Sequence, residues 1–180
     1  MIEKFTLVVC TLNRPNLVEK CLESVFKNSL IPEKIIIIDQ NYDFLTYKKI
    51  VNLFKIKKYN KYKIIKKLIE KGLTISKNIS LKYVDTKYVF FIDDDITLKK
   101  RFFFEIITLI SKKKAHGVSG VISNYDGNFI RDTIYFFFNF NIFRDNRYYF
   151  KNFKNLKNKN LYAKVFQLPG GITCFNKKIF

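Results

Sequence analysis

Short apolar runs alternate along this chain with longer segments in which apolar residues recur at the spacing of a helix. Residues 5–10, 35–38 and 88–92 are mostly apolar and rich in β-branched or aromatic side chains, and less continuous runs lie at 64–69 and 117–122. Runs of this kind are typical of strands that are covered on both faces. Because strands that alternate with helices predict βαβ units, we expect an α/β fold with a mainly parallel, Rossmann-like sheet and helices on both of its faces.

Amphipathic segments separate these runs and predict helices at about 15–27, 44–59, 73–83 and 99–113. Pro15 stands at the start of the first helix, where proline is tolerated, and Gly72 breaks the chain before the third. After residue 123 the pattern changes to hairpin-like pieces over 124–143 and a loop rich in Lys and Asn over 144–160. We expect residues 1–180 to form a single domain, because 180 residues can enclose one hydrophobic core.

The charge of the chain bears on its partners. Lysine and arginine outnumber acidic residues by 34 to 15, which gives a formal charge of +19. Such a charge raises nucleic acid or acidic lipid as partners. The lysines are scattered over nearly every segment, for example at 48–49, 66–67 and 112–114, instead of gathering on one predicted element. This distribution argues against nucleic acid as a partner and still favours an anionic substrate.

The cysteines and the N-terminus bear on where the protein works. Cys10, Cys21 and Cys174 are odd in number and lack CxxC spacing, so neither a disulfide framework nor a zinc site is indicated. The N-terminus lacks the basic start, long apolar stretch and cleavage site of a signal peptide. The longest strongly apolar stretch, 134–143, is far shorter than the roughly 20 residues of a membrane helix, so no span is predicted. We expect a cytoplasmic protein, and contact with the inner face of the membrane stays open.

Acidic residues stand where two predicted strands end. Asp39 follows the apolar run 35–38, and Asp93, Asp94 and Asp95 follow the later one. Sheets of this class bind ligands beyond the carboxyl ends of their strands. In extended backbone Asp93 and Asp95 would point to one side, where Mg²⁺ or Mn²⁺ could bridge a carboxylate and phosphate oxygens. A solvated acidic turn explains the triplet alone equally well, and Asp39 could simply end a strand in a turn.

Several segments follow one another in the order and spacing of a known family. They are the loop and helix start at 8–15 and 21–25, the strand closed by 32–39, the glycine and Lys-Asn segment 72–78, the Asp-x-Asp strand 88–95 and the glycine segment 168–178. Together they resemble glycosyltransferase family two and cover most of the chain. Each motif is weak alone, and their common order and spacing carry the resemblance.

The resemblance implies the GT-A fold, a nucleotide-diphosphate sugar donor such as a UDP- or dTDP-sugar, a divalent metal (Mg²⁺ or Mn²⁺) and inversion at the anomeric carbon. The nucleotide-sugar-binding residues that it implies are Thr11, Leu12, Asn13, Asp39, Lys77, Asn78, Asp93 and Asp94, the metal ligands are Asp93 and Asp95, and the acceptor-side residues are Gly170 and Gly171. In these roles Asp39 would accept a hydrogen bond from the base, and Lys77 would lie near the base or diphosphate.

The sequence departs from the family's pattern in two places. Gln40 follows Asp39 where the family often has a second acidic residue, so base recognition would rest on Asp39 and main-chain groups. An inverting transfer also needs a general base that takes the proton from the acceptor hydroxyl. The family supplies this base beyond the glycine segment, and the chain ends at Phe180 before that motif. We therefore expect the general base beyond Phe180 and a domain that is incomplete at its C-terminus.

Two other functions compete with a glycosyltransferase. A sugar-nucleotide pyrophosphorylase-like enzyme would need a glycine-rich phosphate loop after the first strand, and residues 11–15 contain no glycine. A non-catalytic basic module could bind nucleotide, nucleic acid or acidic lipid through its lysines. The acceptor, which could be a saccharide or a lipid-linked molecule, and the oligomeric state are not indicated by the sequence.

Other site chemistries find no support in the sequence. The chain contains no GxGxxG, GxxxxGK[ST] or GxSxG motif, which sets aside dinucleotide-binding, P-loop and hydrolase folds. The single histidine, His116, has no partner in the sequence and is interpreted as structural. The aromatic residues of 135–140 are interpreted as core, although an exposed set could meet a lipid-linked acceptor.

Overall fold

The computed structural model describes residues 3–66, 71–120, 162, 168 and 170–180. The chain divides into two compact units, one formed by Met1–Ser119 with Gly170–Phe180 and the other by Gly120–Pro169. The elements described below belong to the first unit. The hairpin-like pieces, the aromatic residues of 135–140 and the loop predicted up to 160 lie outside the described residues. The expectation of a single domain stays a prediction.

Strands and helices alternate in the first unit from β1 to β5, as the sequence predicts. The strands are β1 (Phe5–Thr11), β2 (Lys34–Asp39), β3 (Tyr62–Lys66), β4 (Tyr88–Asp93), β5 (Gly117–Ser119) and β6 (Ile172–Asn176). The helices are α1 (Pro15–Phe26), α2 (Leu45–Ile56), α3 (Leu73–Leu81), α4 (Phe102–Lys113) and the short 3-10 helix η2 (Lys177–Ile179). No helix in the described part of the chain is both long and apolar enough to cross a membrane.

The strands form one six-stranded sheet in the order β3-β2-β1-β4-β6-β5. The strands β3, β2, β1 and β4 run parallel to one another. The strand β6 is antiparallel to both β4 and β5, which flank it. The predicted mainly parallel sheet is therefore confirmed, with one antiparallel strand inserted between β4 and β5.

The strand β6 is the element that the sequence analysis does not predict. Its residues follow directly on the two glycines of the segment 168–178, which is interpreted from the sequence as a motif and not as a strand. The five residues of β6 become a strand through pairing with β4, which lies far away along the chain. The third strand also differs from its prediction, because it begins at Tyr62, and residues 67–70 lie outside the described part.

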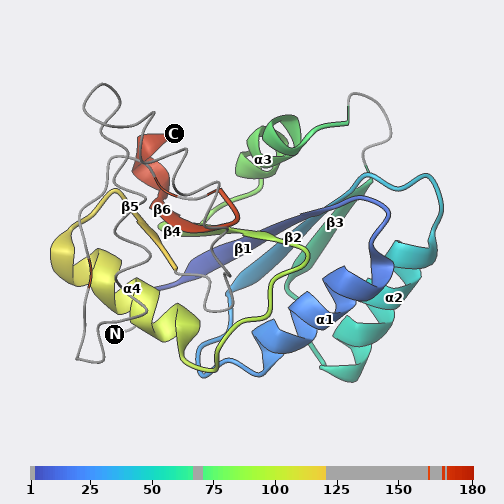
Figure 1. Cartoon of the computed structure of the whole chain (residues 1–180), viewed down its shortest axis with the longest axis horizontal. Coiled ribbons are helices and arrows are strands. Elements are labelled where there is room, and N and C mark those ends of the chain that lie inside the picture. The colour runs from blue at the N-terminus through green and yellow to red at the C-terminus, as the bar shows by residue number, and fades with distance from the viewer. Residues whose placement is uncertain (1–2, 67–70, 121–161, 163–167, 169) are drawn as a thin grey trace, which may run out of the picture. The chain divides into compact units, whose positions relative to one another are not determined.

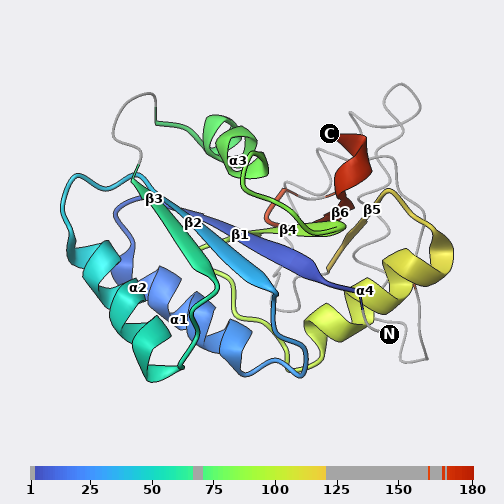
Figure 2. The ribbon, with the colours of Figure 1, turned by 180° about the vertical axis from the view of Figure 1, so that it is seen from behind.

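Side chains that alternate along the strands build a core on each face of the sheet. On one face Phe5, Leu7 and Val9 of β1 cluster with the apolar sides of α1, α2 and α4. On the other face Val8 of β1 belongs to a smaller cluster that includes Leu81 of α3. Figures 1 and 2 show this arrangement, with α3 on the opposite side of the sheet from α1 and α2. The predicted helices on both faces are confirmed.

Candidate functional site

The carboxyl ends of three parallel strands meet at one edge of the sheet. Thr11 pairs with Asp39 in the register of β1 and β2, and Cys10 pairs with Asp93 in the register of β1 and β4. Asp39 and Asp93 therefore flank the end of β1 on its two sides. Asn13, in the loop after β1, adopts the left-handed conformation with φ of 57°, which asparagine tolerates better than most residues.

Protein donors surround the carboxylate of Asp39, which is fully buried. Its Oδ1 accepts hydrogen bonds from the backbone N–H and the side-chain amide of Asn41, at 3.0 and 2.6 Å. Its Oδ2 lies 3.3 Å from Nζ of Lys66 at the end of β3. A buried carboxylate needs such partners to offset its lost hydration. In this arrangement Asp39 orders the end of β2, and its expected hydrogen bond to a base stays a prediction.

The residues after Asp39 link the end of β2 to two other segments. Asn41 accepts a hydrogen bond from the backbone N–H of Asn13 through its Oδ1. Gln40, which replaces the family's second acidic residue, accepts the backbone N–H of Gly72 through its Oε1 at 2.8 Å. The end of β2 is thereby joined to the loop after β1 and to the start of α3.

The acidic triplet is divided between a strand and a turn. The strand β4 ends at Asp93, while Asp94 and Asp95 lie in a turn, so the extended backbone assumed from the sequence holds for Asp93 alone. The turn sends the two side chains into different surroundings. The side chain of Asp94 is 6% exposed and that of Asp95 is 51% exposed. Oδ2 of Asp94 accepts a hydrogen bond from Oγ1 of Thr11 at 2.7 Å. Arg14 reaches both turn carboxylates, at 3.3 and 3.2 Å.

Of the acidic residues at this edge, Asp93 is the one whose carboxylate has no protein donor in the described part of the chain. Its side chain is half-buried, and it accepts no hydrogen bond from the residues that the structure describes. Burial raises the pKa of Asp93, the nearby Lys77 ammonium opposes this shift, and the charges of Asp95 and Asp94 add to it. A carboxylate that is partly desolvated and has no donor gains more from a bound cation than one that is already paired.

The helix α3, which lies on the face of the sheet opposite α1 and α2, supplies a cation near Asp93. Nζ of Lys77 donates a hydrogen bond to the carbonyl of Gly170 at 2.9 Å, and its charge acts on Asp93. Asn78 and Leu12 are exposed. Within the described residues, no side-chain hydrogen bond joins either of them to the rest of the site. Gly170 and Gly171 form the turn that leads into β6, and the carbonyl of Gly171 accepts the backbone N–H of Asp93 at 2.9 Å.

The donor set at this edge fits a divalent ion only together with a phosphate ligand. Within the described ranges, no three His, Cys, Asp or Glu side chains are gathered so that they could hold a metal ion by themselves. Mg²⁺ is commonly bound through one or two carboxylates, with substrate phosphates and water completing its shell. Asp93 and Asp95, the metal ligands that the resemblance implies, are carboxylates of this kind, and their role in holding Mg²⁺ or Mn²⁺ stays a prediction. They do not form a closed metal cage.

Several residues of this edge are missed by the sequence analysis. Arg14 lies within the first motif, but nothing in the sequence shows that it reaches Asp94 and Asp95. Lys66 contacts Asp39 because β3 pairs with β2, and that register is not visible in a single sequence. The contact of Asn41 leaves a detectable signal in Asp39, since an Asp side chain often accepts the backbone N–H two residues further on, as Asp39 does from Asn41.

Fold and site together define an α/β domain of the GT-A type, with acidic residues at the ends of β2 and β4. The sequence matches the family model described as Glycosyl transferase family 2 over residues 6–180. The chain belongs to this family. A comparison with curated proteins finds no match.

Solved structures share the fold. One is the mannosyltransferase PcManGT from Pyrobaculum calidifontis in complex with GDP-Man and Mn²⁺, with a TM-score of 0.70 and 15% identity over 99% of this chain and 46% of that chain. Another is S. aureus TarS 1-349 in complex with UDP-GlcNAc, with a TM-score of 0.56 and 19% identity over 69% of this chain and 37% of that chain. The chain therefore spans less than half the length of these two proteins.

Proposed function

We propose that this chain binds a nucleotide-diphosphate sugar together with Mg²⁺ or Mn²⁺ and forms the donor side of an inverting glycosyltransferase. The open carboxylate of Asp93, next to the exposed carboxylate of Asp95, is the observation that carries the proposal. Membership of the family supports sugar transfer as the reaction. The structural neighbours support a nucleotide-sugar donor, since their crystals hold GDP-Man with Mn²⁺ or UDP-GlcNAc.

The metal and diphosphate are assigned to the end of β4 and its surroundings. Asp93 and Asp95 would hold the divalent ion, which would join them to the diphosphate oxygens. Asp93 would also approach the ribose. Arg14 and Lys77 bring positive charge to the same edge of the sheet. When bound, the ion supplies charge neutralisation for the leaving nucleotide diphosphate.

The nucleoside is assigned to the loop after β1 and the end of β2. Thr11, Leu12 and Asn13 would lie beneath it, Asp39 would face the base, and Asn78 would lie near the base or diphosphate. Asp94 contributes by holding Thr11 and Arg14 in place. The cations act more strongly on the charge that grows in the transition state than on the intact donor, and this difference lowers the barrier.

The acceptor is assigned to the two glycines that precede β6. Gly170 and Gly171 would border the acceptor, which is a saccharide or a lipid-linked molecule. The general base is not assigned to a residue of this chain. We place the reaction in the cytoplasm, where nucleotide sugars of the UDP or dTDP type would serve as donors.

Calorimetry with UDP-, dTDP- and GDP-sugars, in the presence of Mn²⁺ or of EDTA, tests this function. We expect one donor class to bind with Mn²⁺ and to lose most of its affinity with EDTA. The variant Asp85→Asn serves as a control, because Asp85 is exposed and pairs with Lys34 at the start of β2, away from the carboxyl ends of the strands. The absence of binding for every donor with both Mn²⁺ and Mg²⁺ would rule the proposal out.

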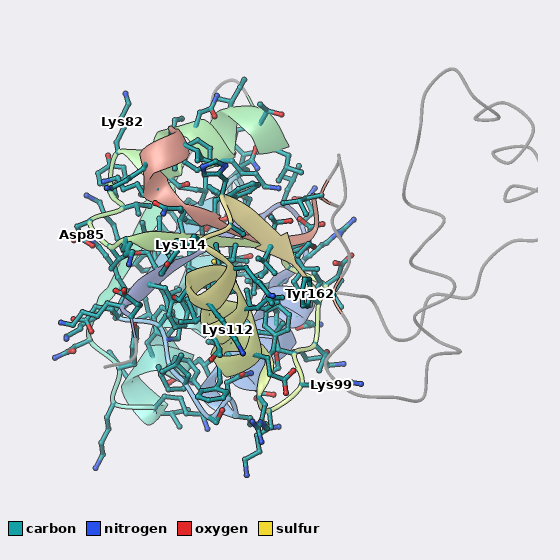
Figure 3. All side chains as sticks on the ribbon, turned by 90° about the vertical axis from the view of Figure 1, so that its left-hand side faces the viewer. Lys82, Asp85, Lys99, Lys112, Lys114 and Tyr162 are labelled. Atoms are coloured by element: carbon teal, nitrogen blue, oxygen red, sulfur yellow. The ribbon has the colours of Figure 1, made fainter. Side chains whose placement is uncertain are left out.

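The same preparation tests the basic-module alternative. Figure 3 shows that the labelled lysines Lys82, Lys99 and Lys112 belong to separate parts of the fold, and each of them is exposed. This spread does not favour a dedicated polyanion surface. If single-stranded nucleic acid or acidic vesicles bound with a steep salt dependence that Asp95→Ala left unchanged, while no nucleotide sugar bound, the basic module would replace the glycosyltransferase.

A further inference from the structure

Gly171 lies against Asp93 in two ways. Its backbone carbonyl bonds the backbone of Asp93, and the carboxylate of Asp93 fills the space beside its Cα where a side chain would begin. A Cβ atom at Gly171 would stand 2.8 Å from Oδ2 and 3.5 Å from Cγ of Asp93. The carbonyl of Gly171 meanwhile accepts the backbone N–H of Asp93 at 2.9 Å. The carboxylate of Asp93 thus occupies space that any side chain at position 171 would fill.

Backbone conformation does not explain the glycine at this position. Neither Gly170 nor Gly171 has a positive φ, so an L-residue could adopt the backbone of either. A Cβ at Gly170 would meet no atom within 4 Å. The two adjacent glycines therefore differ in what a side chain would touch, and only Gly171 leaves room for a functional group.

The glycine turn is held in place by groups on two other elements. Nζ of Lys77 on α3 donates to the carbonyl of Gly170 at 2.9 Å, and the backbone of Asp93 on β4 donates to Gly171. Beyond the turn, Ile172 pairs with Ile92 in the register of β4 and β6. A side chain at 171 could not move away with the backbone, so the end of the short Asp93 side chain would have to rotate instead.

We propose that Gly171 is a positioning residue for the metal carboxylate: because it lacks a side chain, Oδ2 of Asp93 can take the place from which it reaches the ion. The inference rests on the proposed function, since it assumes that Asp93 holds the metal. Rotation of the carboxylate weakens metal binding, because a Mg²⁺-like ion needs its oxygens at about 2.0–2.1 Å in a nearly octahedral arrangement.

Mn²⁺ affinity, measured by electron paramagnetic resonance with UDP and separately with GDP, tests the proposal in Gly171→Ala and Gly170→Ala. We expect Gly171→Ala to weaken Mn²⁺ binding by about 10-fold to 100-fold, the usual effect of disturbing a group that orients a metal ligand. Gly170→Ala keeps its carbonyl and gains a methyl group in open space, and its proposed place beside the acceptor does not enter a measurement without acceptor, so its Mn²⁺ affinity should stay within about twofold of the wild type.

The outcomes separate this inference from the function on which it rests. Wild-type binding of Mn²⁺ that Gly171→Ala leaves within about twofold overturns the positioning role and leaves the metal site intact. A wild type that binds no Mn²⁺ with either nucleotide overturns both. Equal losses in Gly170→Ala and Gly171→Ala also overturn the inference, because they would point to a general need for a flexible turn.

A stability measurement keeps the proposal testable if Gly171→Ala folds poorly. Removal of the Asp93 side chain removes the contact, so Gly171→Ala should cost less stability in an Asp93→Ala background than in the wild type. Circular dichroism melts of the four proteins give this comparison directly. If Gly171→Ala costs as much stability in the Asp93→Ala background as in the wild type, the methyl group clashes with something other than Asp93 and the inference fails.

Discussion

The ends of β2 and β4 carry the same residue type at the same edge of the sheet, yet their carboxylates are in opposite states. Asp39 is fully buried, and Asn41 and Lys66 engage both of its oxygens. Asp93 is half-buried, and its carboxylate accepts no hydrogen bond within the described part of the chain. At these two strand ends, the protein's own donors occupy the carboxylate of Asp39, whereas the carboxylate of Asp93 has none among the described residues and can accept a ligand.

Of the changes at these two strand ends, Asp39→Ala is expected to have the largest effect, on the free energy of unfolding. This change leaves the amide of Asn41 and the ammonium of Lys66 without their shared acceptor, so we expect a loss of about 3 kcal/mol in the free energy of unfolding, measured with urea. The exposed Asp85→Ala should cost less than about 1 kcal/mol. A loss below about 1 kcal/mol in unfolding free energy for Asp39→Ala would show that the hydrogen-bonded carboxylate of Asp39 does not stabilise the fold.

Next in size is the effect of Asp93→Asn on binding. The amide loses the charge that would hold the divalent ion, so the affinity for a nucleotide diphosphate with Mn²⁺ should fall by about 100-fold, or about 2.7 kcal/mol. Calorimetry in parallel with EDTA measures the metal-dependent part. If Asp93→Asn binds like the wild type while Asp95→Asn does not, the open site belongs to the turn and not to the strand end.

Thr11→Val should have a smaller effect, on the fold and not directly on the metal. The buried carboxylate of Asp94 would lose its 2.7 Å hydrogen bond from Thr11 and keep only the longer contact with Arg14. We expect a loss of about 2 kcal/mol in unfolding free energy. The exposed Thr97 provides a matched Thr→Val control with little effect, and equal losses in the two variants would contradict a specific role for Thr11.

The smallest expected effect is a pH-dependent difference between the metal-free wild type and Asp93→Asn. Burial raises the pKa of Asp93 in the folded protein. Protonated Asp93 is therefore favoured by folding, so its contribution to stability is present below the pKa of the unfolded chain and is lost as the pH rises through the folded pKa.

Asp93→Asn, which cannot ionise, should consequently melt at a higher temperature than the wild type near pH 7, and the difference should shrink toward pH 3. Melting curves without metal, taken at several pH values, measure this difference. A variant that is less stable than the wild type at pH 7 would mean that Asp93 has an internal donor, as Asp39 has.

The sequence predicts most of this fold, for a physical reason. Apolar runs and amphipathic segments are local patterns, so β1 to β5 and the four helices α1 to α4 lie close to their predicted places. The strand β6 is not predicted, because its residues acquire strand structure by pairing antiparallel with β4 far away in the sequence. The antiparallel strand is also the element that brings Gly171 to Asp93.

The candidate site is predictable from the sequence only as far as it depends on local patterns. The sequence indicates Asp39 and Asp93 through their place at strand ends, because carboxyl ends of parallel strands share one edge. It does not distinguish the closed carboxylate from the open one. That difference depends on the reach of Lys66 and Asn41 to Asp39 and on the pairing of β3 with β2, which are properties of the folded chain.

Anomalous diffraction from a crystal of this protein grown with Mn²⁺ and a nucleoside diphosphate, UDP or GDP, tests the central claim most directly. The account predicts one strong manganese peak about 2.1 Å from a carboxylate oxygen of Asp93, within reach of Asp95, with diphosphate oxygens completing the shell. A bound nucleotide with no manganese at Asp93, or manganese only at an acidic residue away from the end of β4, would contradict it.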